Sequence, residues 1–249
     1  MSAEIENIVL PLLIFVSALL YSSVGFAGAS GYIAAMGLVG VTSAIMKPAA
    51  LILNIFVAAS ATYKFHRAGA FSWRLFWPLA ISSIPFAYIG GFLTLPGLIY
   101  EPLIGLILIY AAWRSFYNVN SHSDGHIKYV PLPLYLICGG IIGLLSGLTG
   151  IGGGIFLSPF LISFRWAEAR AASGIAAAFI FVNSIFGLLG VISTDGVILP
   201  RIFPLWALAA VIGGLVGAWL GSKRFKNATI QKILALILLL VGIKMIAMP

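Results

Sequence analysis

A run of glycines in the second half of the chain is the feature best suited to chemistry. The segment GLTGIGGGIFLSP, residues 147–159, holds five glycines between Gly147 and Gly154. Each glycine costs roughly 1 kcal/mol in a helix interior relative to alanine, so three in a row should break a helix. Where the chain re-enters a helix, free amide N–H groups and the positive end of the helix dipole can hold an anion without a buried lysine.

The first half carries a weaker copy of this segment, VGFAGASGY at residues 24–32. Two such breaks, facing each other across a pseudo-two-fold axis, would hold one small oxyanion between them. We expect the contacts to come from main-chain groups and nearby hydroxyls: Gly25, Gly28, Gly150, Gly152, Gly153, Gly154, Ser22, Ser23, Ser30, Ser146 and Thr149. For isolated glycines such as Gly90 and Gly217, close helix packing is the better interpretation.

Four other polar residues lie in apolar surroundings. Asn54 and Asn183 follow the two glycine segments, and either could line a pathway or form a structural interhelical hydrogen bond. Lys47 and Arg170 occupy matching places, each just before the helix expected to follow the glycine segment. They could steer an anion to the two ends of a pathway, or they could be interfacial cations whose stems lie along apolar surface.

The sequence contains no residue pattern that would predict a catalytic or cofactor site. We find no nucleophile–base pair, no paired carboxylates and no metal-ligand spacing among His66, His122 and His126. GIGGG lacks the Lys-Ser/Thr of a nucleotide-binding loop. Cys138 is the single cysteine and is expected to pack inertly in the core. We therefore predict no enzyme activity, cofactor or metal.

Composition identifies the environment in which these segments must fold. The 249 residues are 61% hydrophobic and 8% charged, against roughly 45–50% and 25% in soluble proteins. Uncharged runs span Asn7–Met46, Leu75–Tyr100, Tyr129–Phe164, Ala171–Thr194 and Ile202–Ser222. A spanning helix needs about 20 apolar residues, so the chain is predicted to be an all-α polytopic protein of the inner cell membrane, in contact with lipid.

The ends and the net charge fit this interpretation. The start MSAEIENIVL lacks the basic region of a cleavable signal peptide, so we expect the first helix to be retained. The net charge of +8 has its simplest cause in cytoplasmic loops that set topology, and nucleic acid is not an expected partner. A homodimer is compatible with the sequence but not required by it.

The chain contains an internal repeat. Gly25 and Gly28 match Gly150 and Gly153, and further pairs continue to the chain ends: Gly69 with Gly196, Arg74 with Arg201, Gly90 with Gly217 and Arg114 with Lys244. The repeats are residues 1–117 and 131–249, joined by a polar linker at 118–130. Each repeat reads as a glycine-interrupted segment followed by three helices.

Loop charge indicates that the repeats are inverted. Lys64, His66, Arg67 and Arg74 lie in one loop of the first repeat, whereas the basic cluster of the second, Lys223, Arg224, Lys226 and Lys232, lies one loop later. Equivalent loops then face opposite sides, as in many secondary transporters. Arg114 and Lys244, which mark the same repeat position, argue against this. Inversion needs an odd number of crossings per repeat, so the glycine segment must either re-enter or cross twice.

The segment GLLSGLTGIGGGIFLSPFLI, residues 143–162, resembles the signature of the sulfite exporter family TauE/SafE. The first copy, residues 21–38, and HRAGAFSWRLFWPL, residues 66–79, fit the duplicated layout of that family, although Ala27 and Ala29 stand where glycines are expected. The resemblance implies a multi-pass permease for sulfite, sulfoacetate or other organosulfonates. Alternatives are uptake of the same anions, an anion channel of this architecture, or a membrane-embedded enzyme or assembly factor.

Overall fold

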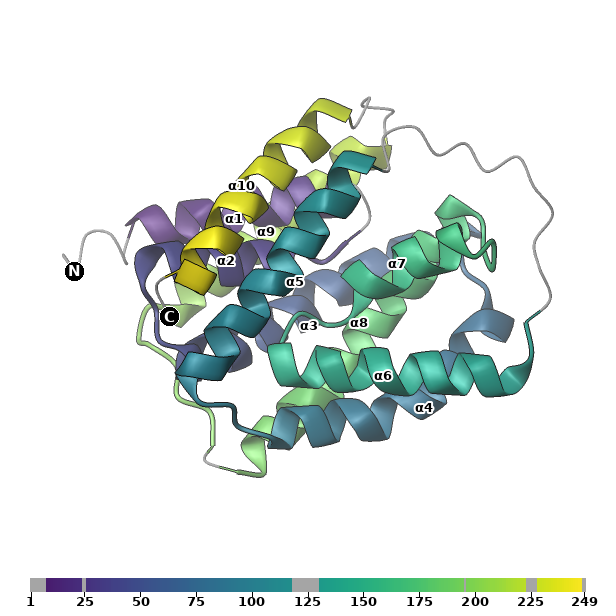
Figure 1. Ribbon diagram of the computed structural model, residues 1–249. Helices are drawn as coiled ribbons and strands as arrows, with labels where there is room; N and C mark the ends of the chain where they lie inside the picture. The colour runs from purple at the N-terminus through teal and green to yellow at the C-terminus, as the bar shows by residue number, and fades with distance from the viewer. Residues whose placement is uncertain (1–7, 24–25, 118–129, 195, 223–227, 248–249) are drawn as a thin grey trace.

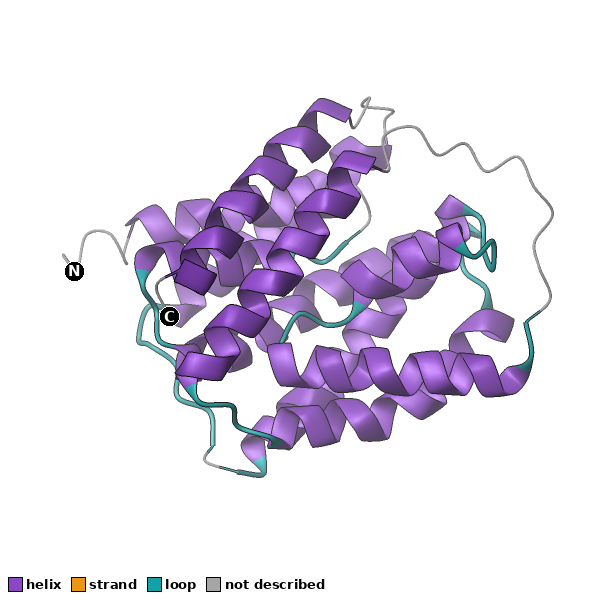
Figure 2. Ribbon diagram, in the orientation of Figure 1, coloured by secondary structure: helices purple, strands orange, loops and turns teal. Residues whose placement is uncertain are grey.

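The computed structural model describes residues 8–23, 26–117, 130–194, 196–222 and 228–247. These residues form ten helices and no strand (Figures 1 and 2). In chain order the helices are α1 Leu10–Ser23, α2 Ala29–Val39, α3 Ser43–Arg67, α4 Trp73–Phe92, α5 Gly97–Tyr117, α6 Leu132–Thr149, α7 Gly154–Ser163, α8 Ala169–Ile192, α9 Phe203–Ser222 and α10 Ala228–Ala247.

The same order of helices occurs twice. Two short helices separated by a glycine-containing break, α1 and α2, precede α3, α4 and α5. The break between α6 and α7 then precedes α8, α9 and α10 in the same way. This is the order of elements that the glycine segments and apolar runs predict.

Helix length and hydropathy fit a polytopic membrane protein. Within the described residues, four helices are long and apolar enough to cross a membrane: α3, α4, α6 and residues 170–192 of α8. The remaining apolar helices are shorter over the part described. Large apolar side chains such as Leu98, Ile81 and Leu240 are exposed on the protein surface, which is favourable when that surface faces lipid.

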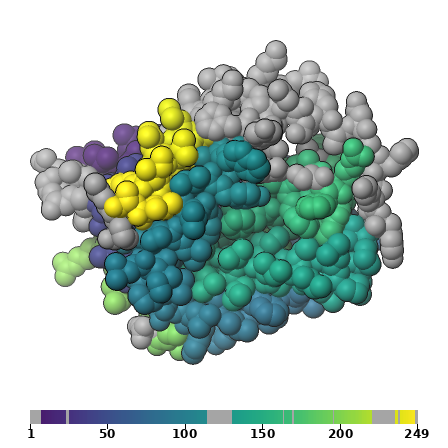
Figure 3. Space-filling model, viewed as in Figure 1, coloured from purple at the N-terminus to yellow at the C-terminus, as the bar shows by residue number. Residues whose placement is uncertain are grey.

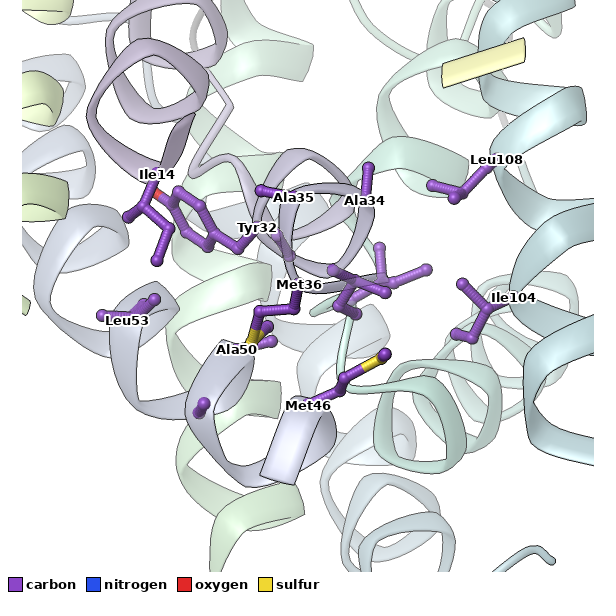
Figure 4. Close-up of a cluster of buried hydrophobic side chains, with 14 of the residues drawn as sticks. Ile14, Tyr32, Ala34, Ala35, Met36, Met46, Ala50, Leu53, Ile104 and Leu108 are labelled. Carbon is purple, nitrogen blue, oxygen red and sulfur yellow. The ribbon is translucent and has the colours of Figure 1, made fainter. Parts of the chain in front are cut away.

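The short helix α2 lies at the centre of the largest apolar cluster (Figure 4). Almost all of its residues are buried, as expected for a helix that is apolar on every face. Tyr32 and Met36 pack against α1 and α3, and Ile104 of α5 lies on the other side of α2. A helix so enclosed fixes the position of the first break within the fold.

Glycines bring pairs of helices into backbone contact. Along α6, Gly139, Gly143 and Gly147 face α4, and a Cβ at any of them would meet main-chain atoms of that helix. Gly90 of α4 faces α6 in the same way, and Gly217 of α9 faces the Leu19 carbonyl of α1. The predicted packing role of Gly90 and Gly217 is confirmed. Gly147, the first glycine of the glycine-rich segment, belongs to this packing surface.

Helices at matching positions of the two repeats lie antiparallel. Gly174, near the start of α8, packs against Ala70 just beyond the end of α3, whereas Gly187, near the end of α8, faces Leu51 near the start of α3. The pair α5 and α10 is also antiparallel, since Gly105 faces Gly242 and Ile246 while Gly242 faces Ile109 (Figure 1). The two helices lie side by side on the face of the molecule seen in Figure 3.

The remaining principal contacts exchange between the repeats. Helix α4 packs on α6 and α8, and its counterpart α9 packs on α1 and α3. The glycine contacts show that α4 and α6 run parallel, as do α9 and α1. If each helix is exchanged with its counterpart in the other half of the chain, the pair α4–α6 becomes α9–α1 and the pair α4–α8 becomes α9–α3. The set of main contacts is therefore the same after the exchange.

Candidate functional site

The second break is a tight left-handed turn between two helices. Gly150, Gly152 and Gly153 have φ values of 78°, 82° and 77°. Gly150 ends α6, where its N–H donates to Ser146 O at 2.9 Å, and Gly153 immediately precedes α7. Residues with a side chain rarely adopt a positive φ, which explains why the turn requires glycine. Gly154 is the first residue of α7.

Amide groups at this break lack protein acceptors. Among the described residues, the N–H groups of Gly152, Gly153, Gly154 and Ile155 form no hydrogen bond, and bonding resumes when Phe156 N donates to Gly153 O at 3.1 Å. Gly152, Gly153 and Gly154 are buried, and Ile155 is partly exposed. The start of α7 therefore presents donors and the positive end of the helix dipole to the protein interior.

Unpaired polar side chains surround the same turn. Ser146 Oγ, Asn54 Oδ1 and Ser184 Oγ are buried and have no hydrogen-bond partner. A Cβ at Gly152 would lie 3.0 Å from Asn54 Nδ2 and 3.3 Å from Ser184 Oγ, and a Cβ at Gly153 would lie 3.3 Å from the Ser146 Cβ. Asn54 Nδ2 lies 3.5 Å from Gly150 O. Buried polar atoms without partners are uncommon and mark a place where a polar ligand can bind.

Ser184 was missed by sequence reasoning, because a serine beside Asn183 in a long apolar helix looks like any small packing residue. It reaches the break because α8 crosses α3 antiparallel, which places Ser184 and Asn54 on either side of Gly152. The adjacent pair Asn183–Ser184 is the sequence signal that was available. Only the crossing of α3 and α8 shows which member contacts the break.

Thr149 is occupied locally. Its hydroxyl donates to Leu145 O at 2.6 Å and accepts from Ile151 N at 3.3 Å. Its carbonyl accepts a 2.8 Å hydrogen bond from Tyr100 Oη. These bonds place Thr149 in the turn as a brace, with no free hydroxyl donor.

The first break has a different interior. Tyr32 Oη donates to Ala27 O at 2.6 Å, and Ser30 Oγ donates to Tyr21 Oη at 2.6 Å. Gly28 has φ 101° and packs against the Tyr32 ring. The Ser30 hydroxyl and the Ala27 carbonyl are therefore already hydrogen-bonded to the buried Tyr21 and Tyr32, and are not free to contact a ligand. Gly25 lies outside the described residues.

The hydroxyls before the first break do not form one group. Ser23 Oγ donates to Leu20 O at 2.7 Å. Ser22 Oγ is buried without a partner and lies toward Gly214 of α9. The structure therefore gathers unpaired donors at the second break more than at the first.

Asn183 is completely buried in α8. Its Nδ2 donates to Phe179 O at 2.9 Å, within the same helix, and its Oδ1 has no partner. The bond fixes the amide so that the oxygen is the free acceptor. Of the two asparagines, Asn54 is the one placed against the second break.

The two matched cations hold helix ends. Lys47 is buried, and its ammonium donates to the carbonyls of Gly90, Gly91 and Leu93 at 3.0, 3.0 and 2.9 Å. It therefore satisfies the C-terminal end of α4. Arg170 is exposed, and its guanidinium donates to Ala68 O, just beyond α3, at 3.2 Å. Both have structural partners that sequence reasoning did not anticipate.

The broken helices, enclosed amides and apolar exterior define a class: a polytopic membrane transporter with a small polar site inside a helical bundle. The sequence matches the family described as Sulfite exporter TauE/SafE over residues 10–245. The chain belongs to this family, whose members are membrane transporters and not enzymes.

Two curated relatives carry names of the same kind. One, named "Probable membrane transporter protein y4hK", from Sinorhizobium fredii, is 38% identical over 246 residues, covering 98% of this chain and 99% of the relative. Another, named "Probable membrane transporter protein MJ0441", from Methanocaldococcus jannaschii, is 33% identical over 129 residues, 50% of this chain and 47% of the relative. No solved structure matches this chain.

Proposed function

We propose that this protein is a secondary transporter that exports a small sulfur-containing anion, such as sulfite, sulfoacetate or another organosulfonate. The observation that carries the proposal is the second break, where unpartnered amides at the start of α7 meet the unpaired Ser146 and Ser184 hydroxyls. Backbone and hydroxyl donors suit an oxyanion. The family description supports sulfite and its relatives as the class of cargo.

The substrate is bound by the amides of Gly152, Gly153 and Gly154, with Ser146, Ser184 and Asn54 around it. Donors in an enclosed site are worth more than in water, because hydrogen bonds to a charged group strengthen when water is excluded. The first break, at Gly28, contributes to the shape and packing of the site and not to anion binding, since its polar neighbours form hydrogen bonds with Tyr21 and Tyr32.

The two repeats, residues 1–117 and 131–249, form an inverted repeat in the inner cell membrane. A two-fold axis perpendicular to the helices makes counterpart helices antiparallel, which is the relation of α3 to α8 and of α5 to α10. The switched basic loops support the same arrangement. Alternating access then follows from rocking of one repeat against the other around the site.

Flux in proteoliposomes tests the function. Purified protein is reconstituted, and uptake of sulfite, methanesulfonate, sulfoacetate, sulfate and acetate is measured against concentration. We expect saturable flux of sulfite or a sulfonate and weak flux of acetate. Flux that never saturates and follows membrane potential alone would indicate a channel. Absence of flux for every sulfur anion would overturn the proposed substrate class.

A further inference from the structure

A cavity of about 240 Å³ opens at the end of the molecule where α3 begins and α4 and α8 end. Its rim consists of exposed residues, Ala44, Thr94, Gly196 and Ile198. Its floor consists of buried ones, including Lys47, Gly91 and Tyr100. The lining thus passes from surface to interior.

The floor of this cavity touches the second break. Tyr100 lines the cavity, and its hydroxyl bonds the carbonyl of Thr149, the residue directly before Gly150. Lys47 lines it too, and a Cβ at Gly150 would lie 3.0 Å from the Lys47 carbonyl oxygen. Tyr100 and Lys47 therefore separate the cavity from the glycine turn.

The floor carries a positive charge. The Lys47 ammonium is bonded to three main-chain carbonyls at the C-terminal end of α4. These carbonyls bear no net charge, and the negative end of the helix dipole offsets only part of the charge of the ammonium. Within the described part of the chain it forms no ion pair with a carboxylate. Glu101 lies by the rim near Ser43, since a Cβ at Gly97 would be 3.5 Å from Ser43 Oγ and 3.8 Å from Glu101 Oε1. Thr94 follows Leu93, whose carbonyl holds the ammonium.

The equivalent place in the other repeat is covered. There, Gly174 near the start of α8 packs directly against the Ala70 carbonyl. Arg170 bonds the Ala68 carbonyl, so the segment after α3 lies across the helix start. After α8, Thr194, Gly196 and Ile198 instead form one wall of the cavity.

We propose that this cavity is the vestibule through which the anion passes between the second break and the surface of the protein, with Lys47 supplying its attracting charge and Tyr100 closing its inner end. The proposal rests on the anion transport proposed above and adds its route. The ammonium lies in the floor of the vestibule, between the rim and the glycine turn. Breaking the bond from Tyr100 to Thr149 connects the vestibule with the Gly152 and Gly153 amides.

Charge-selective labelling tests the vestibule. Cys138 is replaced by alanine, and Thr94→Cys is compared with Leu98→Cys, which lies at the same end of the molecule but is 74% exposed and does not line the cavity. Each is labelled in detergent with a maleimide bearing a sulfonate and with one bearing a trimethylammonium. We expect the ratio of anionic to cationic rates to be about three- to tenfold higher at Thr94→Cys, and to converge at high salt.

Flux then decides whether the vestibule is the route. Labelling Thr94→Cys should remove most sulfite and methanesulfonate flux in proteoliposomes, and labelling Leu98→Cys should leave it intact. Unchanged flux after complete labelling of Thr94→Cys overturns the route, as does an equal rate ratio at the two positions. If the unlabelled protein carries no anion, the transport proposal fails by itself, and the rate ratio still reports whether the cavity attracts anions.

Discussion

Ser184 tests the anion site with the smallest change to the fold. Its hydroxyl is buried and unpaired beside Gly152. Ser184→Ala should remove one hydrogen bond to a charged ligand, worth about 1.5–3 kcal/mol, and weaken apparent affinity roughly 10- to 150-fold. Thermal stability should stay the same or rise, because an unsatisfied polar atom is lost. Concentration-dependent flux and melting in detergent measure both.

Ser83→Ala is the matched control for this prediction. Ser83 is equally buried, but its hydroxyl donates to Ala80 O at 3.2 Å within α4. We expect its variant to keep wild-type affinity. Equal affinity in Ser184→Ala and the wild type would mean that the hydroxyl does not touch the cargo.

Gly153→Val should abolish transport. The residue has φ 77°, and an added Cβ would lie 2.9 Å from the Phe179 ring and 3.0 Å from Ile142. The side chain would distort the turn and shield its amides, and losing one or two charge-assisted bonds corresponds to about 2–4 kcal/mol, or a roughly 30- to 1000-fold fall in affinity.

Gly69→Ala separates backbone strain from loss of the site, since Gly69 has φ 67° and nothing within 4 Å of an added Cβ. We expect Gly69→Ala to transport normally and both Gly153→Ala and Gly153→Val to fail while retaining a folded elution profile. Wild-type rate and affinity in folded Gly153→Val would place the anion site elsewhere.

Lys47 and Arg170 should differ in their effect on stability. Lys47→Met leaves three carbonyls at the end of α4, those of Gly90 and Gly91 buried, without their donor, at a cost on the order of 2–4 kcal/mol. Arg170→Met loses one exposed hydrogen bond and should cost much less. Melting curves in one detergent compare them. A larger loss in Arg170→Met would contradict the assigned partners.

At the scale of helices, close packing through glycine holds the bundle. Gly217→Ala would drive a methyl group into the Leu19 carbonyl of α1, and Gly90→Ala would do the same to the Leu144 carbonyl of α6. We therefore expect a loss of about 1–3 kcal/mol in the free energy of unfolding for either variant. Leu208→Ala, an exposed position on α9, is the control. Thermal unfolding that is unchanged in both glycine variants would rule out backbone contact.

Local sequence was enough to predict the helices and the breaks. Glycine clusters and uncharged runs act over a few residues, so they located the α6–α7 turn and the three helices after each break. The sequence alone left the role of Gly147 undecided, because a glycine in a packed helix and one in a turn look alike until the neighbouring helix is known. Its contact with Ala87 decides between them.

At the scale of the whole molecule, the two breaks are not equivalent. Repeat matching predicted two similar anion contacts, but Tyr21 and Tyr32 bond into the first break while Ser146 and Ser184 stay unpaired at the second. Lys47 likewise donates to carbonyls that lie 43 to 46 residues away in the sequence. Such partners depend on which helices cross. They therefore cannot be identified from the sequence until the contacts between helices are known.

Topology in the membrane follows from the ends of α3 and α8. Thr94 and Gly196 line one cavity, and Gly97 faces Ser43 beside it, so these connections share one end of the molecule. Gly69 lies at the opposite end of α4, where Arg170 bonds Ala68. The basic residues around Gly69 predict that this end is cytoplasmic, together with Asn227, which lies outside the described residues.

Cysteine labelling of intact cells measures this arrangement. In a Cys138→Ala background, an impermeant maleimide should label Gly97→Cys and Gly196→Cys from outside, and Gly69→Cys and Asn227→Cys only after the membrane is opened. Gly69 and Gly196 have φ values of 67° and 77°, so a cysteine there strains the backbone, but its side chain meets no neighbouring atom within 4 Å. Because these two glycines occupy the same place in their repeats, labelling on opposite sides requires inversion. Labelling of both from the same side would overturn the inverted repeat and contradict the antiparallel packing of α3 and α8.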